Sequence, residues 1–167
     1  MEAQSNGITF REMVLTDIET VYGIECSCFS QPWSVESLIN ELTVNDAAYY
    51  AVAEFDGRVI GYAGMWVVCD EAHMTNIAVD ADYRRRGAAT GLILHLMRTA
   101  KSRNALCITL EVRETNHRAQ RVYNALGFRY AGTRRRYYSD TGENALILWN
   151  DNIDATLDKF STNEIID

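Results

Sequence analysis

The sequence predicts an α/β (α+β) domain in which a mixed central sheet of about seven strands is flanked by about four helices. Hydrophobic residues make up 47% of the 167 residues and charged residues 23%, which is the ordinary balance of a globular domain. β-rich runs recur along the chain between turn signals. Near the middle, the hydrophobic period changes from that of a strand to that of a helix and back. A strand–helix–strand crossover of this kind makes its two strands parallel neighbours.

The first half of the chain is predicted to contain four strands and two helices. Ser34 follows Pro32-Trp33 and precedes apolar residues at helical spacing, so it starts a helix. Asp56-Gly57 separates two β-rich runs and is the strongest short hairpin signal. The predicted elements are a strand at Ile8–Arg11, a helix opened by a capping box at Thr16–Glu19, the helix from Ser34, and strands at Tyr49–Phe55, Val59–Val68 and His73–Val79.

The second half is predicted to contain two helices and three strands. One helix begins after Gly87 and runs to about Arg103, and the other is capped by Asn116 and stopped by Gly127. The strands are Leu106–Val112, Phe128–Tyr138 and Ala145–Trp149. No repeat or linker interrupts this order, so one domain is expected over residues 1–150, followed by a polar, acidic tail at 151–167.

The charge and the apolar runs exclude several classes of protein. The formal net charge is −7, which disfavours general electrostatic binding to nucleic acid. No apolar run reaches the roughly 18 residues that cross a membrane, so no membrane association is expected. The polar segment Met1–Gly7 carries no hydrophobic signal region, which predicts a cytoplasmic protein. The four cysteines fit no common zinc spacing and the three histidines lie far apart, so no metal site is predicted.

The segment from Asn76 to Thr90 carries the first chemical signal. A strand ends at Val79, three arginines (Arg84, Arg85 and Arg86) follow, and the small residues Gly87, Ala88 and Ala89 open an amphipathic helix. Small residues let backbone N–H groups approach a ligand closely, and a helix N-terminus carries partial positive charge. The segment therefore favours a pyrophosphate-binding loop, although it matches neither the Walker motif nor the dinucleotide fingerprint.

A second group of motifs lies between Leu110 and Phe128 and includes Leu110-Glu111-Val112-Arg113, Asn116 and Gly127-Phe128. With this group, the chain resembles the GNAT acetyltransferase superfamily. Arg84, Gly87 and Ala89 meet its acyl-CoA pattern Gln/Arg-x-x-Gly-x-Gly/Ala. The resemblance is closer to the RimI family, the ribosomal-protein-alanine N-acetyltransferases, and covers nearly the whole chain. The motifs that carry it are Trp33-Ser34, Asn76–Val79, Leu110–Arg113, Asn116, Tyr123, Gly127-Phe128 and Arg136–Tyr138.

This resemblance implies a GNAT fold with acetyl-CoA as the acetyl donor. The strand Ile77-Ala78-Val79 matches the one that pairs with the pantetheine arm and holds the thioester. Arg84 and the loop from Arg85 to Thr90 match the pyrophosphate site, and Asn116 matches a further contact to the cofactor.

For the acceptor side of the reaction, the resemblance implies that Glu111 is the proton acceptor and Tyr123 the proton donor. It also implies that Trp33, Tyr137 and Tyr138 contact the substrate. Asn144 stands where the family's Glu-Asp-Ala sequence has an aspartate.

The requirements of amine acetylation favour these residue types independently of the resemblance. An N-terminal amine has a pKa near 7.7–8.0 and is mostly protonated at neutral pH, so it needs a base such as Glu111 before it attacks. A backbone N–H of Ile77–Val79 is suited to stabilise the oxyanion. A tyrosine with a pKa near 10 is a poor donor to a thiolate near 8.5, so Tyr123 either has a shifted pKa or supplies a hydrogen bond alone.

The expected function is therefore acetyl-CoA-dependent acetylation of a protein N-terminus. The family's usual acceptor is the N-terminal alanine of small-subunit ribosomal protein 18, a basic protein that suits an acidic enzyme. Two alternatives remain open: an acetyltransferase for a small amine such as a polyamine, an amino acid or an antibiotic, and a non-catalytic acyl-CoA-binding module. A monomer or weak dimer is expected.

Overall fold

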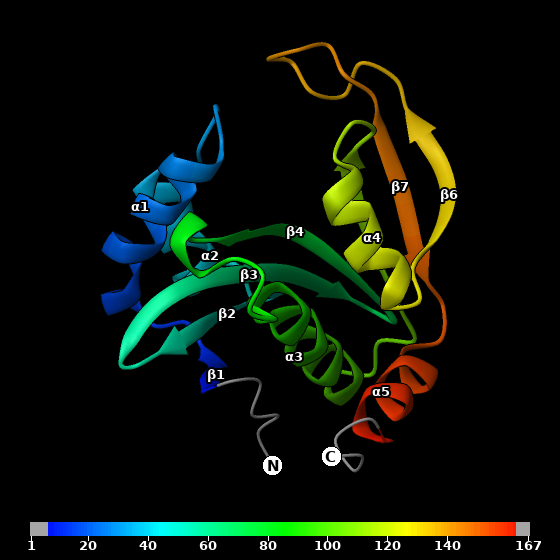
Figure 1. Cartoon of the computed structure of the whole chain (residues 1–167), viewed down its shortest axis with the longest axis horizontal. Coiled ribbons are helices and arrows are strands. Elements are labelled where there is room, and N and C mark those ends of the chain that lie inside the picture. Colours follow the sequence, from blue (N-terminus) through cyan, green and yellow to red (C-terminus); the bar gives the residue numbers. More distant parts are fainter. Residues whose placement is uncertain (1–6, 163–167) are drawn as a thin grey trace. The chain divides into compact units, whose positions relative to one another are not determined.

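The computed structural model describes residues 7–162. Residues 1–6, on which the predicted location depends, and residues 163–167 of the predicted tail lie outside the described residues. The described part has seven strands and five α-helices (Figure 1). In chain order they are β1 (Ile8–Glu12), α1 (Ile18–Cys28), α2 (Val35–Thr43), β2 (Ala48–Phe55), β3 (Arg58–Val68), β4 (Glu71–Val79), α3 (Ala88–Ser102), β5 (Cys107–Arg113), α4 (His117–Ala125), β6 (Arg129–Arg134), β7 (Ala145–Asn150) and α5 (Ile153–Thr162).

The strands hydrogen-bond in the order β1-β2-β3-β4-β5-β7-β6, so the predicted seven-stranded mixed sheet is confirmed. β4 and β5 are parallel, as the predicted crossover requires, whereas β1–β2, β2–β3, β5–β7 and β6–β7 are antiparallel. The backbone contacts divide the chain into two compact units. The first unit comprises residues 1–66 and 75–96, and the second comprises residues 67–74 and 97–167.

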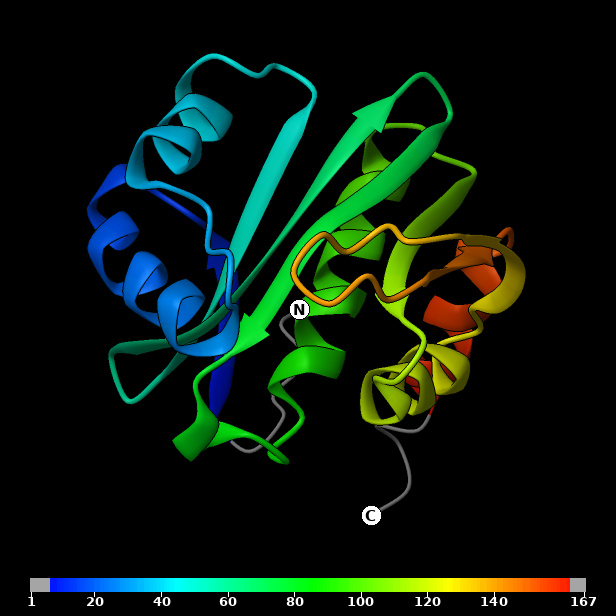
Figure 2. The same ribbon diagram turned by 90° about the horizontal axis from the view of Figure 1, so that it is seen from above.

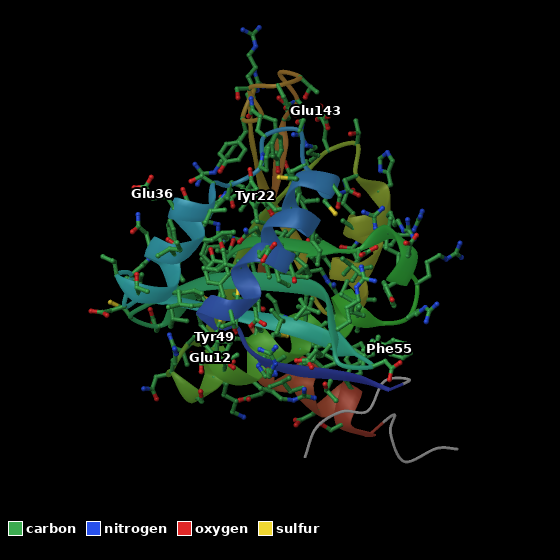
Figure 3. All side chains as sticks on the ribbon, turned by 90° about the vertical axis from the view of Figure 1, so that its left-hand side faces the viewer. Glu12, Tyr22, Glu36, Tyr49, Phe55 and Glu143 are labelled. Carbon is green, nitrogen blue, oxygen red and sulfur yellow. The ribbon has the colours of Figure 1, made fainter. Side chains whose placement is uncertain are left out.

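In the first unit, α1 and α2 pack on β2, β3 and the end of β4 (Figures 1 and 2). The shared core consists of Met13, Ile18, Val21, Ile24, Leu38, Tyr50, Val52, Val59, Tyr62 and Ala78. Tyr22 and Glu36 lie on the outer faces of the two helices and are exposed (Figure 3). The predicted hairpin is confirmed: β2 and β3 are joined by Asp56 and Gly57, whose φ angles are +52° and +75°.

The two helix starts predicted in this unit have different outcomes. Ser34 caps α2 as predicted, because its side chain accepts the Ser37 N–H at 3.1 Å. The capping box predicted at Thr16–Glu19 is wrong. A 3-10 turn precedes α1, and the Asp17 carboxylate accepts the Val14 N–H and two hydrogens of Arg11 instead of capping the helix.

In the second unit, α4 lies beside β7 (Figure 1), and its ends are those predicted: Asn116 caps it and Gly127, at φ +85°, ends it. The predicted strand Phe128–Tyr138 is too long, because β6 stops at Arg134. Residues 135–144 form a loop between β6 and β7, drawn in orange in Figure 2.

The predicted polar tail begins with a helix rather than with an irregular segment. Ile153 of α5 is buried, and the hydroxyl of Thr156 donates to the Leu126 carbonyl at 3.0 Å. The Asn150 side chain donates to the same carbonyl at 2.9 Å. These bonds fasten α5 to the end of α4, so the chain packs beyond residue 150.

Gly91 sets how closely α3 approaches β1 in the first unit. A Cβ at this position would lie 2.0 Å from Cζ of the buried Phe10 ring. We expect Gly91→Ala to lower the free energy of unfolding by about 1–3 kcal/mol, because the rigid ring cannot yield without strain. Urea denaturation measures the change.

Gly23→Ala is the matched control, since nothing lies within 4 Å of a Cβ at this exposed position of α1. It should raise the free energy of unfolding by about 1 kcal/mol, the difference in helix propensity between the two residues. Wild-type stability in Gly91→Ala would contradict the close approach.

Candidate active site

In the first unit, the end of β4 leads into the predicted pyrophosphate loop. A 3-10 turn at Ala81–Tyr83 follows β4, and α3 starts at Ala88. Arg85 and Gly87 both have left-handed backbone, with φ angles of +63° and +83°. Such turns aim successive N–H groups toward a common point, and the first N–H groups of a helix lack acceptors within it. The loop therefore has a backbone geometry that is suited to an anion at a helix N-terminus.

The three arginines of this loop have different surroundings. Arg84 Nε donates to the Val79 carbonyl at 3.1 Å, and its Nη2 lies 3.4 Å from Cys28 Sγ. The guanidinium therefore links the loop to the ends of β4 and α1. The guanidinium of Arg86 lies 5.4 Å from the centre of the Tyr83 ring and 5.7 Å from that of Phe55, which is labelled in Figure 3. Arg85 is exposed, so its guanidinium is accessible to a ligand.

Trp33 lies in the turn between α1 and α2. Its backbone N–H donates to Glu25 Oε1 at 3.1 Å, and its side chain packs against the shared core. A cavity of about 440 Å³ opens beside it and is lined by Pro32, Trp33, Ser34, Ser37, Asn40 and Glu41. We call this the α2 cavity.

In the second unit, Glu111 is the centre of a small charged cluster. Its side chain is 11% exposed on β5, its Oε2 lies 2.6 Å from His73 Nε2, and its Oε1 lies 3.3 Å from Arg134 Nε. An ionised carboxylate only accepts hydrogen bonds, so Nε2 of His73 carries the hydrogen. The hydrogen bond from His73 is the main cause that holds the pKa of Glu111 below its ordinary value; burial opposes this shift, and the charge of Arg134 adds to it. Glu111 is therefore ionised at neutral pH.

Tyr123 lies on the buried face of α4, where its ring packs edge-on against Phe128 with centroids 5.7 Å apart. Burial raises its pKa far above the ordinary value for tyrosine. Its hydroxyl makes no hydrogen bond within residues 7–162, and a buried hydroxyl without a partner costs about 1–3 kcal/mol. A hydroxyl kept protonated in this way is a hydrogen-bond donor for a ligand rather than an acid.

Asn116 and the two loop tyrosines complete the predicted site. The Asn116 side-chain oxygen accepts the Ala119 N–H at 3.2 Å, so its amide NH₂ alone faces outward for a ligand. The Arg113 guanidinium stacks 4.0 Å from the centre of the Tyr138 ring, and Tyr137, half exposed, packs edge-on against Tyr138. Burial raises the pKa of Tyr138 to about 12. Tyr138 interacts electrostatically with both Glu111 and Tyr123, which places these three residues in one neighbourhood.

Asn144 fastens the loop that carries these tyrosines. Its Oδ1 accepts the Arg136 N–H at 3.0 Å, and its Nδ2 donates to Glu114 Oε2 at 3.2 Å. The position is therefore occupied by a neutral bridge between the loop and the end of β5.

Sequence reasoning missed His73 and Arg134 as members of the Glu111 cluster. His73 starts the predicted strand His73–Val79, and the parallel neighbour of that strand carries Glu111. The missing information was the register: His73 pairs with Thr109, two residues before Glu111 on the same face of β5. Arg134 lies in the predicted strand Phe128–Tyr138, and its contact with Glu111 joins β6 to β5 across β7.

The described residues contain neither a metal-ligand cluster nor a membrane-spanning helix. Residues 7–162 contain no group of three or more His, Cys, Asp or Glu side chains arranged to hold a metal ion. None of the helices in this range combines the length and the apolar character that crossing a membrane requires.

Comparison with known proteins gives consistent results. Residues 18–128 match the model of the acetyltransferase (GNAT) family. A Bacillus subtilis protein, named as a candidate ribosomal protein bS18-alanine N-acetyltransferase, is 43% identical over 139 residues, which are 83% of this chain and 92% of that protein. The Escherichia coli ribosomal protein bS18-alanine N-acetyltransferase is 35% identical over 144 residues, 84% of this chain and 95% of the relative. A crystal structure of the ribosomal-protein-S18-alanine N-acetyltransferase from Escherichia coli superposes with a TM-score of 0.78, at 33% identity, over 85% of this chain and 92% of that one.

The Glu111 cluster predicts a change in titration when its histidine is removed. We expect His73→Ala to raise the pKa of Glu111, because the variant loses the hydrogen bond that contributes most to lowering it. A depressed carboxyl pKa stabilises the folded state above the unfolded pKa of about 4.3, and that contribution disappears as the pH falls through the folded value. The stability lost in the variant is therefore larger at pH 6 than at pH 2.

Carboxyl NMR titration of Glu111 and urea denaturation at the two pH values measure both effects. His117→Ala is the control, because His117 is an exposed histidine of the same unit with no bond to Glu111. An unchanged Glu111 titration in His73→Ala would show that the contact is not formed in solution.

Proposed function

The chain belongs to the acetyltransferase (GNAT) family, and from that premise we propose that it is an acetyl-CoA-dependent N-α-acetyltransferase acting on a protein N-terminus. The acceptor we propose is the N-terminal alanine of ribosomal protein bS18, the substrate in the names of its relatives from Bacillus subtilis and Escherichia coli. The observation that carries the proposal is the pair in the second unit: an ionised carboxylate at Glu111, and a buried Tyr123 hydroxyl with no partner within the described residues.

Acetyl-CoA is the acetyl donor. Its pyrophosphate binds the loop from Arg84 to Thr90, where the left-handed Arg85 and Gly87 and the N-terminus of α3 support anion binding. The backbone of Ile77–Val79 pairs with the pantetheine arm, and Asn116 supplies a further contact. Trp33, Tyr137 and Tyr138 contact the acceptor.

In the proposed reaction, Glu111 accepts a proton from the acceptor's ammonium, directly or through water. The freed amine attacks the thioester carbon and a C–N bond forms. The C–S bond then breaks, CoA leaves as the thiolate, and the second proton of the attacking nitrogen passes to solvent, from which the thiolate is protonated. A backbone N–H of Ile77–Val79 stabilises the oxyanion. The lowered pKa of Glu111 means that it holds the proton only briefly and passes it to solvent.

Tyr123 serves the leaving group. Its raised pKa makes proton transfer to a thiolate near pKa 8.5 unfavourable. We therefore propose that its hydroxyl stabilises the departing sulfur by a hydrogen bond. This role needs no proton transfer and gives the buried hydroxyl its partner.

The protein is further proposed to act in the cytoplasm as a monomer or weak dimer, without binding nucleic acid or a membrane. The net charge of −7 supports an acidic surface that attracts a basic protein acceptor and repels RNA.

The acceptor is tested by comparing specificity constants. We expect kcat/KM for a basic hexapeptide that begins with alanine to exceed that for spermidine by at least about tenfold, a difference of about 1.4 kcal/mol in transition-state binding. The same peptide with an acetylated N-terminus is the control and should not react. A preference for spermidine would replace this proposal with a small-amine acetyltransferase, and turnover of neither acceptor would favour an acyl-CoA-binding module.

The roles of Glu111 and Tyr123 are separated by their pH–rate profiles. We expect Glu111→Gln to lower kcat by roughly 10²–10⁴-fold at pH 7, the usual contribution of a general base. Raising the pH above 8 should restore part of the rate, because solvent then deprotonates the amine. Tyr123→Phe should also be slow but without this rescue, since it acts at the leaving sulfur.

Glu71→Gln is the control for Glu111→Gln, because Glu71 is an exposed carboxylate at the start of β4. It should keep the wild-type profile. Near-full activity of Glu111→Gln at pH 7 would mean that another group takes the proton.

A further inference from the structure

Glu25 is a buried carboxyl group that the proposed mechanism does not use. It lies on α1 of the first unit and is 2% exposed. Its Oε1 accepts the Trp33 N–H at 3.1 Å, and its Oε2 is hydrogen-bonded to the hydroxyl of Tyr62. Burial raises its pKa. Its two oxygens therefore join a helix and a turn to a strand of the sheet.

The series of hydrogen bonds continues from Tyr62 to β4. The Tyr62 hydroxyl accepts from Asn76 Nδ2 at 2.9 Å, and Asn76 Oδ1 accepts from the Thr75 hydroxyl at 2.7 Å. Asn76 comes directly before Ile77–Val79, the segment proposed to hold the thioester. The series of hydrogen bonds therefore runs from the turn that carries Trp33 to strand β4 of the sheet.

The energetics of burial indicate that this series of hydrogen bonds fixes the position of the turn rather than raising the free energy of unfolding. Burying a carboxyl group costs several kcal/mol, and an apolar group of similar volume often gives equal or greater stability. Within the turn, the Trp33 side chain packs against the shared core, whereas Phe29, Pro32 and Ser34 are exposed. The Glu25–Trp33 bond therefore adds a backbone constraint at the residue through which the turn meets the core.

We propose that Glu25 is a positioning residue for the acceptor: through Tyr62 and Asn76, it fixes the Trp33 turn, and with it one wall of the α2 cavity, relative to β4. The inference rests on the proposed function, since it assigns the α2 cavity to the residues of the acceptor that follow the terminal alanine. When the bond is lost, the turn moves and β4 keeps its place in the sheet. Acceptor binding is then weakened and acetyl-CoA binding is not.

The test uses a variant that removes both members of the Glu25–Tyr62 bond, so that neither the buried carboxyl nor the buried phenol is left without the other. The Trp33 N–H and the Asn76 amide lose their acceptors, and both belong to residues that are only partly buried. Glu25→Met/Tyr62→Phe replaces both partners with apolar side chains of similar shape, a change that is often neutral for stability.

Tyr49→Phe is the matched control: Tyr49 is a partly buried tyrosine of β2, and its hydroxyl is hydrogen-bonded to His95 Nε2 of α3 at 2.8 Å, outside the Glu25 series and the α2 cavity. Glu25→Gln is the milder second variant, because its amide oxygen occupies only one of the two acceptor positions and the NH₂ in the other position cannot accept a hydrogen bond.

We expect the double variant to keep a urea midpoint close to that of the wild type and to raise KM for the alanine-initiated peptide at least tenfold. KM for acetyl-CoA should stay within threefold. Glu25→Gln should raise the peptide KM by a smaller factor, and Tyr49→Phe should leave both constants within threefold. A purely structural role would instead lower kcat through a loss of folded enzyme, with both KM values unchanged. That result, or an equal rise of the peptide KM in Tyr49→Phe, would overturn the proposal.

Hydrogen exchange of the Trp33 amide tests the inference without any acceptor. In the wild type this N–H is protected by a buried carboxyl, and in the double variant it should exchange at least tenfold faster. Unchanged exchange would overturn the positioning role even if the peptide is the true acceptor. If the wild type fails to acetylate the peptide, the proposed function fails, and the exchange result still decides whether Glu25 holds the turn.

Discussion

A parallel pairing of three residue pairs between β4 and β5 fixes the geometry on which the candidate chemistry depends. The pairs are Glu71–Cys107, Ala72–Ile108 and His73–Thr109. Since side chains alternate along a strand, Glu111 lies on the same face as Thr109, diagonal to His73 and within reach of its ring. A slip of one residue would turn Glu111 to the opposite face and break its bond to His73. The position of Glu111, its hydrogen bond from His73 and its lowered pKa all follow from this short register.

The surroundings of Glu111 and Tyr123 shift their pKa values in opposite directions. The neighbours of Glu111 favour its charged form, whereas burial disfavours the charged form of Tyr123. One group is therefore always ready to accept a hydrogen bond or a proton, and the other is always ready to donate a hydrogen bond. Such a separation is how a single site holds an acceptor and a donor at one pH. It also limits what each can do in the proposed reaction: a weakly basic carboxylate can pass a proton on but not retain it, and a weakly acidic phenol can donate a hydrogen bond but not readily a proton.

Local signals predicted the parts of this structure that local chemistry determines. The cap at Ser34, the Asp56-Gly57 hairpin and the cap at Asn116 each depend on side-chain and backbone groups a few residues apart, so a short segment specifies them. The capping box at Thr16 failed because Arg11 captures the carboxylate of Asp17, a competition that only the folded chain reveals. The partners of Glu111 and Glu25 were missed for a related reason: His73 and Tyr62 are 38 and 37 residues away in the chain. The sequence motifs pointed to Glu111, and the register of β4 and β5 determined that His73 lies beside it.

Asn144 illustrates how a departure from a family pattern becomes intelligible through its neighbours. An aspartate at this position keeps the hydrogen bond from the Arg136 N–H but places a second carboxylate where Asn144 Nδ2 now lies 3.2 Å from Glu114. Two carboxylates at that distance repel one another, and one of them must take up a proton or move away. With asparagine, the same place holds one negative charge, carried by Glu114, and the loop stays fastened to β5 by a neutral bridge. The identity of residue 144 is therefore coupled to that of residue 114, and the pair, rather than either residue alone, sets the charge beside the tyrosine-bearing loop.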